Sequence, residues 1–148
     1  MRLSDIMNPR VVTIDLEASA QSAWQKMDDE NIYHLVVTRG KSVVGILSHR
    51  DLGGARGEAM RQGKLVAELM QPQIISAHPD TSLREAANLL RGESIGCLPI
   101  LDEHEVLVGI MTVTDLLDLL GQGTVRITTA ADRRPERNVP VSEKLSPH

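Results

Sequence analysis

Cysteine and aromatic residues are scarce in this chain. It has one cysteine (Cys97), one tryptophan, one tyrosine and no phenylalanine. A single cysteine excludes a disulfide framework, which small secreted domains commonly use in place of a large core. With so few aromatic side chains, there is also no platform on which the bases of a nucleic acid could stack. The sequence therefore favours neither a disulfide-stabilised secreted domain nor a nucleic-acid-binding protein.

Long apolar runs and an excess of positive charge are also absent. No stretch approaches the ~18 apolar residues of a transmembrane helix, and the opening MRLSDIMNPRVVTI lacks the apolar segment of a signal peptide. Residues 1–121 hold 11 basic and 17 acidic side chains, whereas residues 122–148 hold 5 and 3. An acidic body offers no face that neutralises phosphates. We expect a cytoplasmic protein of bacterial type, with no nucleic-acid and no membrane partner.

Side-chain clusters typical of metal or catalytic sites are lacking too. The five histidines show no pair at metal-ligand spacing and no neighbouring cysteine. Nothing near Cys97 marks an activated thiol, so it is interpreted as a small strand residue. An enzyme would need a nucleophile, a metal or an acid–base pair, and the motifs supply none. We therefore expect no catalytic residue, no metal and no cofactor.

The sequence does contain an internal repeat. A shift of 63 residues superimposes Met7, Pro9, Ser19, Ala23, Glu30, Ile32 and Leu35 on Met70, Pro72, Ser82, Ala86, Glu93, Ile95 and Leu98. A shift of 64 superimposes Val44, Gly45, Ile46, Asp51 and Leu52 on Val108, Gly109, Ile110, Asp115 and Leu116. Identities in this order, interrupted by a single one-residue insertion, indicate a duplicated unit.

Each copy shows the same order of elements. A short apolar strand, at 11–14 or 74–77, follows a turn that contains proline. Ser19 and Ser82 then have the position of helix N-caps, ahead of apolar residues at helical spacing. Two strands joined by a polar turn come next, at 33–38 and 42–47 in the first copy and at 97–101 and 106–111 in the second. A last helix opens at Ser48 or Thr112.

The predicted fold class is α/β (α+β), with two tandem β-α-β-β-α units packed as one pseudo-two-fold body. A single unit of ~60 residues would have too thin a core to stand alone. We place the units at 1–62 and 63–121, followed by a polar, flexible tail at 122–148 in which TVRITT could add a strand to a sheet edge.

The two closing helices are expected to differ. The first contains Gly53, Gly54 and Gly57, each of which costs ~1 kcal/mol relative to alanine, so it should be weak or broken. The second is compact and reaches Gly121, a residue suited to the C′ position.

The strand–helix junctions carry GILSHRD at 45–51 and GIMTVTD at 109–115. A helix that starts directly after a strand presents unpaired N–H groups, which attract a phosphate. Asp51 or Asp115 could accept hydrogen bonds from ribose hydroxyls, and the glycine would let a ligand approach the backbone. Ser48 and Asp51 also fit a capping box, in which the acid only satisfies the backbone. Recurrence at both junctions favours a ligand.

Ser48, His49 and Asp51 do not form a catalytic triad. Adjacent residues of a helix point about 100° apart, so His49 cannot serve Ser48 as a base within one helix. The second copy has Val113 where the first has His49. His49 and Arg50 instead add positive charge to the first junction, which predicts that phosphorylated ligands prefer it.

Together, DIMNPRVVTI, GILSHRD, GIMTVTD and CLPIL resemble the paired motifs of the cystathionine-β-synthase (CBS) domain family, over residues 1 to about 121. The resemblance implies a stand-alone, bacterial-type CBS pair that binds adenosine-containing ligands in clefts between the repeats. It also implies a flat dimer and a regulatory role, and it places the strands of His34 and Cys97 near the adenine. Val36 departs from the family pattern, because the second copy has Pro99 there.

On this basis the candidate nucleotide-binding residues are Thr13, His34, Val36, Ser48, His49, Arg50, Asp51, Ser76, Cys97, Pro99, Thr112 and Asp115. His34 fits a partly buried strand histidine equally well.

Two functions remain open. One is a regulatory module that binds AMP, ADP, ATP or S-adenosylmethionine and signals by changing conformation. The other is a ligand-independent dimerisation or interaction module with vestigial clefts. The motif would bind the adenosyl group that these ligands share, so it does not distinguish among them. The sequence also does not identify a regulated protein. A homodimer is expected, because the leucines at 116, 117, 119 and 120 span more than one face of a short helix.

Overall fold

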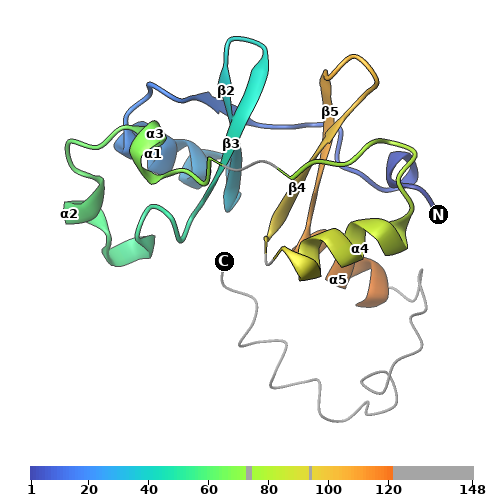
Figure 1. The fold of residues 1–148 in the computed structure, drawn as a ribbon. Helices are drawn as coiled ribbons and strands as arrows, with labels where there is room; N and C mark the ends of the chain where they lie inside the picture. Colours follow the sequence, from blue (N-terminus) through green and yellow to red (C-terminus); the bar gives the residue numbers. More distant parts are fainter. Residues whose placement is uncertain (73–74, 94, 122–148) are drawn as a thin grey trace.

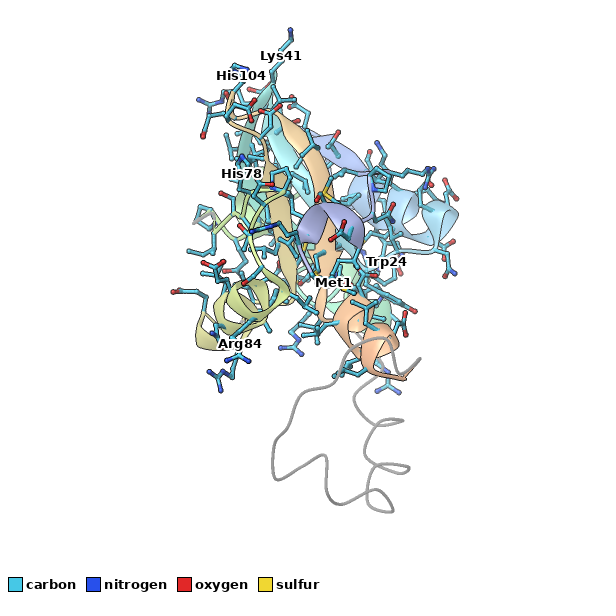
Figure 2. The ribbon with its side chains drawn as sticks, turned by 90° about the vertical axis from the view of Figure 1, so that its right-hand side faces the viewer. Met1, Trp24, Lys41, His78, Arg84 and His104 are labelled. Atoms are coloured by element: carbon cyan, nitrogen blue, oxygen red, sulfur yellow. The ribbon has the colours of Figure 1, made fainter. Side chains whose placement is uncertain are left out.

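The computed structural model describes residues 1–72, 75–93 and 95–121. Its ribbon consists of two halves that lie side by side, each with an antiparallel strand pair beside helices (Figure 1). The turns at the tips of the two strand pairs, which carry Lys41 and His104, lie at the same end of the molecule (Figures 1 and 2). The two junctions that follow these strand pairs therefore share the opposite end. The predicted α/β fold with two tandem units is confirmed.

The first half holds a three-stranded sheet. Its elements are β1 (Thr13–Asp15), α1 (Ala20–Glu30), β2 (His34–Arg39), β3 (Ser42–Ser48), a 3₁₀ turn (Gly54–Arg56), α2 (Glu58–Arg61) and α3 (Val66–Leu69). Strand β2 pairs in parallel with β1 and antiparallel with β3. The Ser19 hydroxyl accepts a hydrogen bond from the N–H of Ser22 at 3.0 Å, which confirms the predicted N-cap of α1.

The second half repeats this order with a smaller sheet. Its elements are α4 (Leu83–Gly92), β4 (Cys97–Leu101), β5 (Leu107–Thr112) and α5 (Val113–Gly121). The Ser82 hydroxyl accepts a hydrogen bond from the N–H of Glu85 at 3.1 Å, so this N-cap is confirmed as well. The strand predicted at 74–77 is reduced to one parallel bridge between Ala77 and Ile100, and residue 74 lies outside the described residues.

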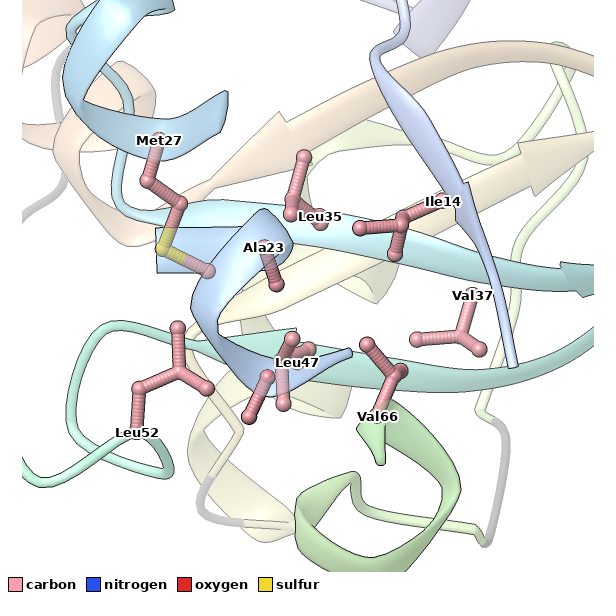
Figure 3. Close-up of a cluster of buried hydrophobic side chains, with 9 residues drawn as sticks. Ile14, Ala23, Met27, Leu35, Val37, Leu47, Leu52 and Val66 are labelled. Atoms are coloured by element: carbon pink, nitrogen blue, oxygen red, sulfur yellow. The ribbon is translucent and has the colours of Figure 1, made fainter. Parts of the chain in front are cut away.

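The hydrophobic core of the first half forms between α1 and its sheet. Ala23 and Met27 of α1 pack with Leu35 of β2 and Leu47 of β3 (Figure 3). Val66 also belongs to this cluster, although it lies in α3, after the end of the first sequence repeat. The core of the first half is therefore completed by the opening segment of the second repeat.

The core of the second half shows the reciprocal arrangement. Leu98 of β4, Met111 of β5 and Ala86 of α4 pack with Leu3, which lies in a 3₁₀ turn (Leu3–Asp5) at the start of the chain. The N-terminus accordingly lies beside the second half in the ribbon (Figure 1). The units predicted at 1–62 and 63–121 thus exchange their opening segments in space.

Backbone hydrogen bonds hold both exchanged segments in place. The N–H of Leu3 donates to the carbonyl of Thr81 at 2.9 Å. The N–H of Val66 donates to the carbonyl of Ala18 at 2.8 Å. Because each segment is bound at its backbone as well as by its buried side chain, the two halves form one packed body.

A methionine of each exchanged segment lies over the glycine of the opposite junction. A Cβ atom built on Gly45 would lie 2.7 Å from Sδ of Met70 and 2.8 Å from the carbonyl oxygen of Gln71. One built on Gly109 would lie 2.5 Å from Sδ of Met7. The interpretation of these glycines as room for a ligand is therefore wrong, because methionine side chains fill the space.

The closing segments of the two halves differ. The predicted weak helix of the first half is confirmed, since only turns, a 3₁₀ turn and the short α2 follow β3. A helix opening at Ser48 is wrong, because Gly53 and Gly54 have φ of +89° and +67°, which a right-handed helix cannot contain. In the second half, α5 follows β5 directly and includes Gly121, so Gly121 is helical and is not the C′ residue. The predicted tail and its TVRITT strand lie outside the described residues.

Alanine at Gly45 should destabilise the protein more than alanine at Gly109. At Gly109 the three atoms nearest to the added methyl all belong to the flexible side chain of Met7, whereas at Gly45 they include the backbone oxygen of Gln71. The carbonyl of Gln71 accepts a hydrogen bond from the N–H of Ile46 at 3.1 Å, so moving it away would break or strain that bond. We expect a loss of about 1–3 kcal/mol for Gly45→Ala, the usual range for overpacking, and less for Gly109→Ala.

Urea denaturation followed by tryptophan fluorescence measures these losses. Gly92→Ala is the matched control, because a Cβ at Gly92 has no other atom within 4 Å. Equal losses at Gly45 and Gly109 would show that the backbone contact does not matter.

Candidate functional site

A cavity of about 520 Å³ opens between the two halves. The first half contributes His34 of β2, Ile46 and Ser48 of β3, and the turn residues Arg50 and Asp51. From the rest of the chain come Gln71, Ile75, Glu93, Ile95, Gly96, Cys97, Val113 and Thr114. This cavity is called the cleft below. The first strand–helix junction lies on one side of it, and Val113 and Thr114 of the second junction lie on the other.

The serine and the aspartate of the first junction cap each other's backbone. The N–H of Ser48 donates to Oδ2 of Asp51 at 2.9 Å, and the N–H of Asp51 donates to Oγ of Ser48 at 3.0 Å. Thr112 and Asp115 form the same pair of bonds at 2.9 and 3.1 Å. The capping interpretation is therefore confirmed at both junctions.

Capping occupies only one of the two oxygens of the Asp51 carboxylate. The other, Oδ1, accepts a hydrogen bond from Nε2 of Gln71 at 3.1 Å. Gln71 is exposed and lines the cleft. Asp51 can therefore hold its turn with one oxygen while presenting the second to the cleft.

Five predicted site residues line the cleft, namely His34, Ser48, Arg50, Asp51 and Cys97. The other seven do not, namely Thr13, Val36, His49, Ser76, Pro99, Thr112 and Asp115. Val36 and Pro99 are fully buried within their sheets. The second junction reaches the cleft through Val113 and Thr114 and not through its capping pair.

Sequence reasoning missed three polar residues of the cleft, Gln71, Glu93 and Thr114, of which Thr114 matches the predicted Arg50 in the repeat. Glu93 carried a signal, since it matches Glu30 in the repeat. Gln71 carried none, because its place beside Asp51 depends on the exchange of the opening segments.

The charges at the cleft are one cation and two carboxylates, from Arg50, Asp51 and Glu93. In the first half, the residue equivalent to Glu93 is Glu30, whose Oε1 is bound by Nη2 of Arg10 at 2.6 Å. Within the described part of the chain, no ion pair involves Glu93. The charge of Glu93 therefore adds to that of Asp51.

His34 and Cys97 are the equivalent strand residues of the two halves. The Nε2 atom of His34 lies close to Gly96, 3.0 Å from where a Cβ would stand, so the imidazole approaches the second half. Burial raises the pKa of the Cys97 thiol, and the nearby carboxylate of Asp115 raises it further. The thiol stays protonated at neutral pH, as befits a small strand residue and not a nucleophile.

His49 turns away from the cleft and packs on aromatic rings. Its ring centre lies 4.6 Å from that of Trp24 and 5.3 Å from that of Tyr33. The helical reasoning against a Ser48–His49 pair does not apply, because Ser48 ends a strand and His49 lies in a turn. His49 is not a base for Ser48 because its ring packs on Trp24 and Tyr33, while the Ser48 hydroxyl accepts the N–H of Asp51 in the cap.

The described residues lack two further features, a metal cluster and a membrane-spanning helix. No group of three or more histidine, cysteine, aspartate or glutamate side chains is placed there to hold a metal ion. No helix in the same part of the chain is long and apolar enough to cross a membrane.

Comparison with known proteins identifies the duplicated unit. The family model of the CBS domain matches residues 3–55 and again 66–122. The chain belongs to the CBS domain family. The second match begins at Val66, the residue that completes the core of the first half. The predicted resemblance to paired CBS motifs is thereby confirmed.

Solved CBS pairs share the fold and contain adenosine compounds. The CBS domain pair of protein MJ0100, in complex with 5′-methylthioadenosine and S-adenosyl-L-methionine, is 26% identical, with a TM-score of 0.73 over 83% of this chain and 98% of that one. CBSX2 from Arabidopsis thaliana, in complex with AMP, is 25% identical, with a TM-score of 0.70 over 84% of this chain and 98% of that one.

An enzyme is among the curated relatives. Homoserine O-acetyltransferase of Methanococcoides burtonii is 32% identical over 120 residues, which cover 80% of this chain but 24% of that protein. The chain thus spans about a quarter of this relative, and the likeness does not extend to the rest of the enzyme.

Proposed function

We propose that this CBS pair is a regulatory module that binds an adenosine-containing ligand in the cleft between its two motifs. The observation that carries the proposal is the cavity of about 520 Å³ in which apolar walls meet the Asp51 oxygen that is not used in the cap. Its volume lies within the roughly 300–1,000 Å³ of small-molecule sites. The 5′-methylthioadenosine, S-adenosyl-L-methionine and AMP of the solved CBS pairs support it.

The lining suits the parts of adenosine. Ile46, Ile75 and Ile95 offer apolar surface to a planar base. Oδ1 of Asp51 can accept bonds from ribose hydroxyls when the Gln71 amide moves aside. The Gln71 amide and a ribose hydroxyl both give this carboxylate a charge-assisted hydrogen bond, so the exchange leaves Asp51 satisfied. Oδ2 keeps its bond to the backbone, so the turn is retained.

Movement of Gln71 also offers a route to signalling. The backbone of Gln71 is bridged to Ile46 in both directions, and the neighbouring Met70 packs over Gly45. A ligand that displaces the amide therefore acts on the segment that joins the two motifs. We propose that ligand occupancy changes the relative position of the motifs through this segment.

The charges of the cleft favour ligands with few negative charges. Arg50 attracts a first phosphate, whereas the carboxylates of Asp51 and Glu93 repel further ones. Among AMP, ADP, ATP and S-adenosylmethionine, we propose AMP or S-adenosylmethionine as the ligand. Of the two basic residues at the first junction, Arg50 lines the cleft and can contact a phosphate, whereas His49 does not line it.

Asp51→Asn should weaken AMP and S-adenosylmethionine binding without unfolding the protein. The Asn side-chain oxygen can still accept the N–H of Ser48, whereas the amide nitrogen cannot accept a ribose hydroxyl. Loss of a charge-assisted bond costs about 1.5–3 kcal/mol of binding free energy, which is at least tenfold in affinity. Calorimetry on the parent and the variant measures it. A parent that binds neither ligand, or a variant that binds as the parent does, contradicts the ribose assignment.

Glu93→Gln should raise the affinity for ATP more than that for AMP. The substitution removes one of two carboxylates that repel the additional phosphates, an effect of about 1 kcal/mol for charges near 4 Å in water. Glu30→Gln is the matched control, because Glu30 occupies the equivalent position, pairs with Arg10 and does not line the cleft. An ATP to AMP affinity ratio that changes equally in both variants would show that Glu93 does not select the ligand.

The apolar surface of α5 supports a homodimer, the second element of the proposal. Leu116 and Leu119 pack against the second core, no residue of α5 is fully buried, and 48% of Leu117 is exposed. Exposed leucines on a helix of this kind mark interaction surfaces. The same surface would serve an interaction module if the cleft proved empty of ligand. The cytoplasmic location stays a prediction.

Leu117→Glu should convert a dimer into a monomer. A charged side chain at an apolar interface is not compensated there, so association weakens. Light scattering at micromolar protein gives the mass, and Val106→Glu is the control because Val106 is 52% exposed but lies in the β4–β5 turn. A monomeric parent, or a dimeric Leu117→Glu, contradicts the proposed dimer surface.

A further inference from the structure

The only tryptophan and the only tyrosine of the chain lie beside the first junction. The His49 ring contacts the rings of both Trp24 and Tyr33. The guanidinium carbon of Arg61 lies 3.7 Å from the centre of the Trp24 ring. Such distances are typical of ring stacking and of cation–π contacts. These four side chains form a stack that connects α1 and α2 to the turn that follows β3.

Arg61 is the buried member of this stack. Only 3% of its surface is exposed, and its Nη1 atom donates to the carbonyl oxygens of Leu52 at 2.9 Å and of Gly54 at 2.8 Å. Its Nε atom is buried without a partner. Burying a guanidinium with an unsatisfied nitrogen costs free energy, so its place inside this loop needs a compensating role.

The turn that Arg61 holds lacks the support that its counterpart has. After Thr112 the chain continues directly into α5. After Ser48 the chain passes through Gly53, with φ of +89°, and no α-helix follows until α2. Leu52 and Gly54, whose carbonyls accept from Arg61, lie one and three residues after Asp51 of the cleft.

We propose that Arg61 is the positioning residue of the cleft. Its bonds to Leu52 and Gly54 and its stacking on Trp24 fix the turn that presents Ser48, Arg50 and Asp51. Arg61 is not among the residues that line the cleft, so it acts through the turn and not by contact. Its effect on a ligand rests on the proposed function, whereas its effect on the turn does not.

The pKa of His49 reports the charge of Arg61 without any ligand. The groups that face or flank its imidazole are Trp24, Tyr33, Arg50, Asp51 and Arg61. Burial lowers the pKa of His49 below its ordinary value of 6.5, and the charge of Arg61 lowers it further. A neutral side chain at position 61 should therefore raise this pKa, whereas lysine, which keeps the charge, should leave it low.

The experiment compares the parent with Arg61→Gln and Arg61→Lys. Arg56→Gln is the matched control, because Arg56 is an exposed arginine of the same loop. For each variant, calorimetry gives the affinity for AMP and for S-adenosylmethionine, and NMR titration gives the pKa of His49, assigned with His49→Asn. Urea denaturation verifies that each variant is folded.

Arg61→Gln should weaken binding of the parent's ligand roughly tenfold, as loss of outer-shell support does at metal sites, and should raise the pKa of His49. Arg61→Lys should recover most of both effects, and Arg56→Gln should show neither. A folded Arg61→Gln with the affinity and the His49 pKa of the parent overturns the proposal.

Two further outcomes are decisive. If Arg61→Gln does not fold, Trp24→Leu replaces it, because leucine removes the surface on which Arg61 stacks, and an unchanged ligand affinity in that variant overturns the proposal. If the parent binds neither ligand, the proposed function fails by itself. Amide hydrogen exchange at Leu52, Gly53 and Gly54, whose N–H groups donate within the turn, then decides whether Arg61 fixes the turn. Faster exchange in Arg61→Gln supports this role, and unchanged exchange shows that Arg61 does not fix the turn.

Discussion

The packing of a methionine over a glycine, once in each direction, sets how the two motifs lie against each other. Met70 reaches Gly45, and Met7 reaches Gly109, each from an opening segment that has crossed to the other half. A side chain larger than hydrogen would press on the backbone of Gln71 at Gly45 and on the side chain of Met7 at Gly109. Because Gln71 directly follows Met70, the same contact also places an amide beside Asp51. The fold and the polar wall of the cleft therefore depend on one steric constraint.

Capping and ligand binding use different oxygens of the same carboxylate. Asp51 binds the backbone of Ser48 through Oδ2, and this bond orients Oδ1 toward Gln71. An acid that was free of the cap would have to be ordered when a ligand arrived, at a cost in side-chain entropy. The structural role thus prepares the proposed functional one. The two interpretations of the Ser-x-x-Asp pattern describe one arrangement.

The sequence predicted what local rules determine. The repeat, the strands other than that at 74–77, the N-caps and the weakness of the glycine-rich segment all follow from spacing and propensity. It did not predict the crossing of the opening segments, because Leu3 and Val66 are simply apolar residues with no mark of which core they enter. The roles of Gln71 and Arg61 were missed for the same reason, since both depend on contacts between segments that are distant along the chain. Reasoning from an ideal helix also misplaced His49, because the glycines replace that helix with turns.

The exchange of opening segments has a consequence for the chain when it is divided. A fragment that ended before Val66 would hold Leu3 without the core that Leu3 fills, and its own core would lack Val66. The remaining fragment would hold Val66 without the first core, and its own core would lack Leu3. Each piece carries the part that the other needs, so the two fragments are complementary as well as incomplete. A break in the linker between the motifs should accordingly yield a noncovalent pair and not two independent domains.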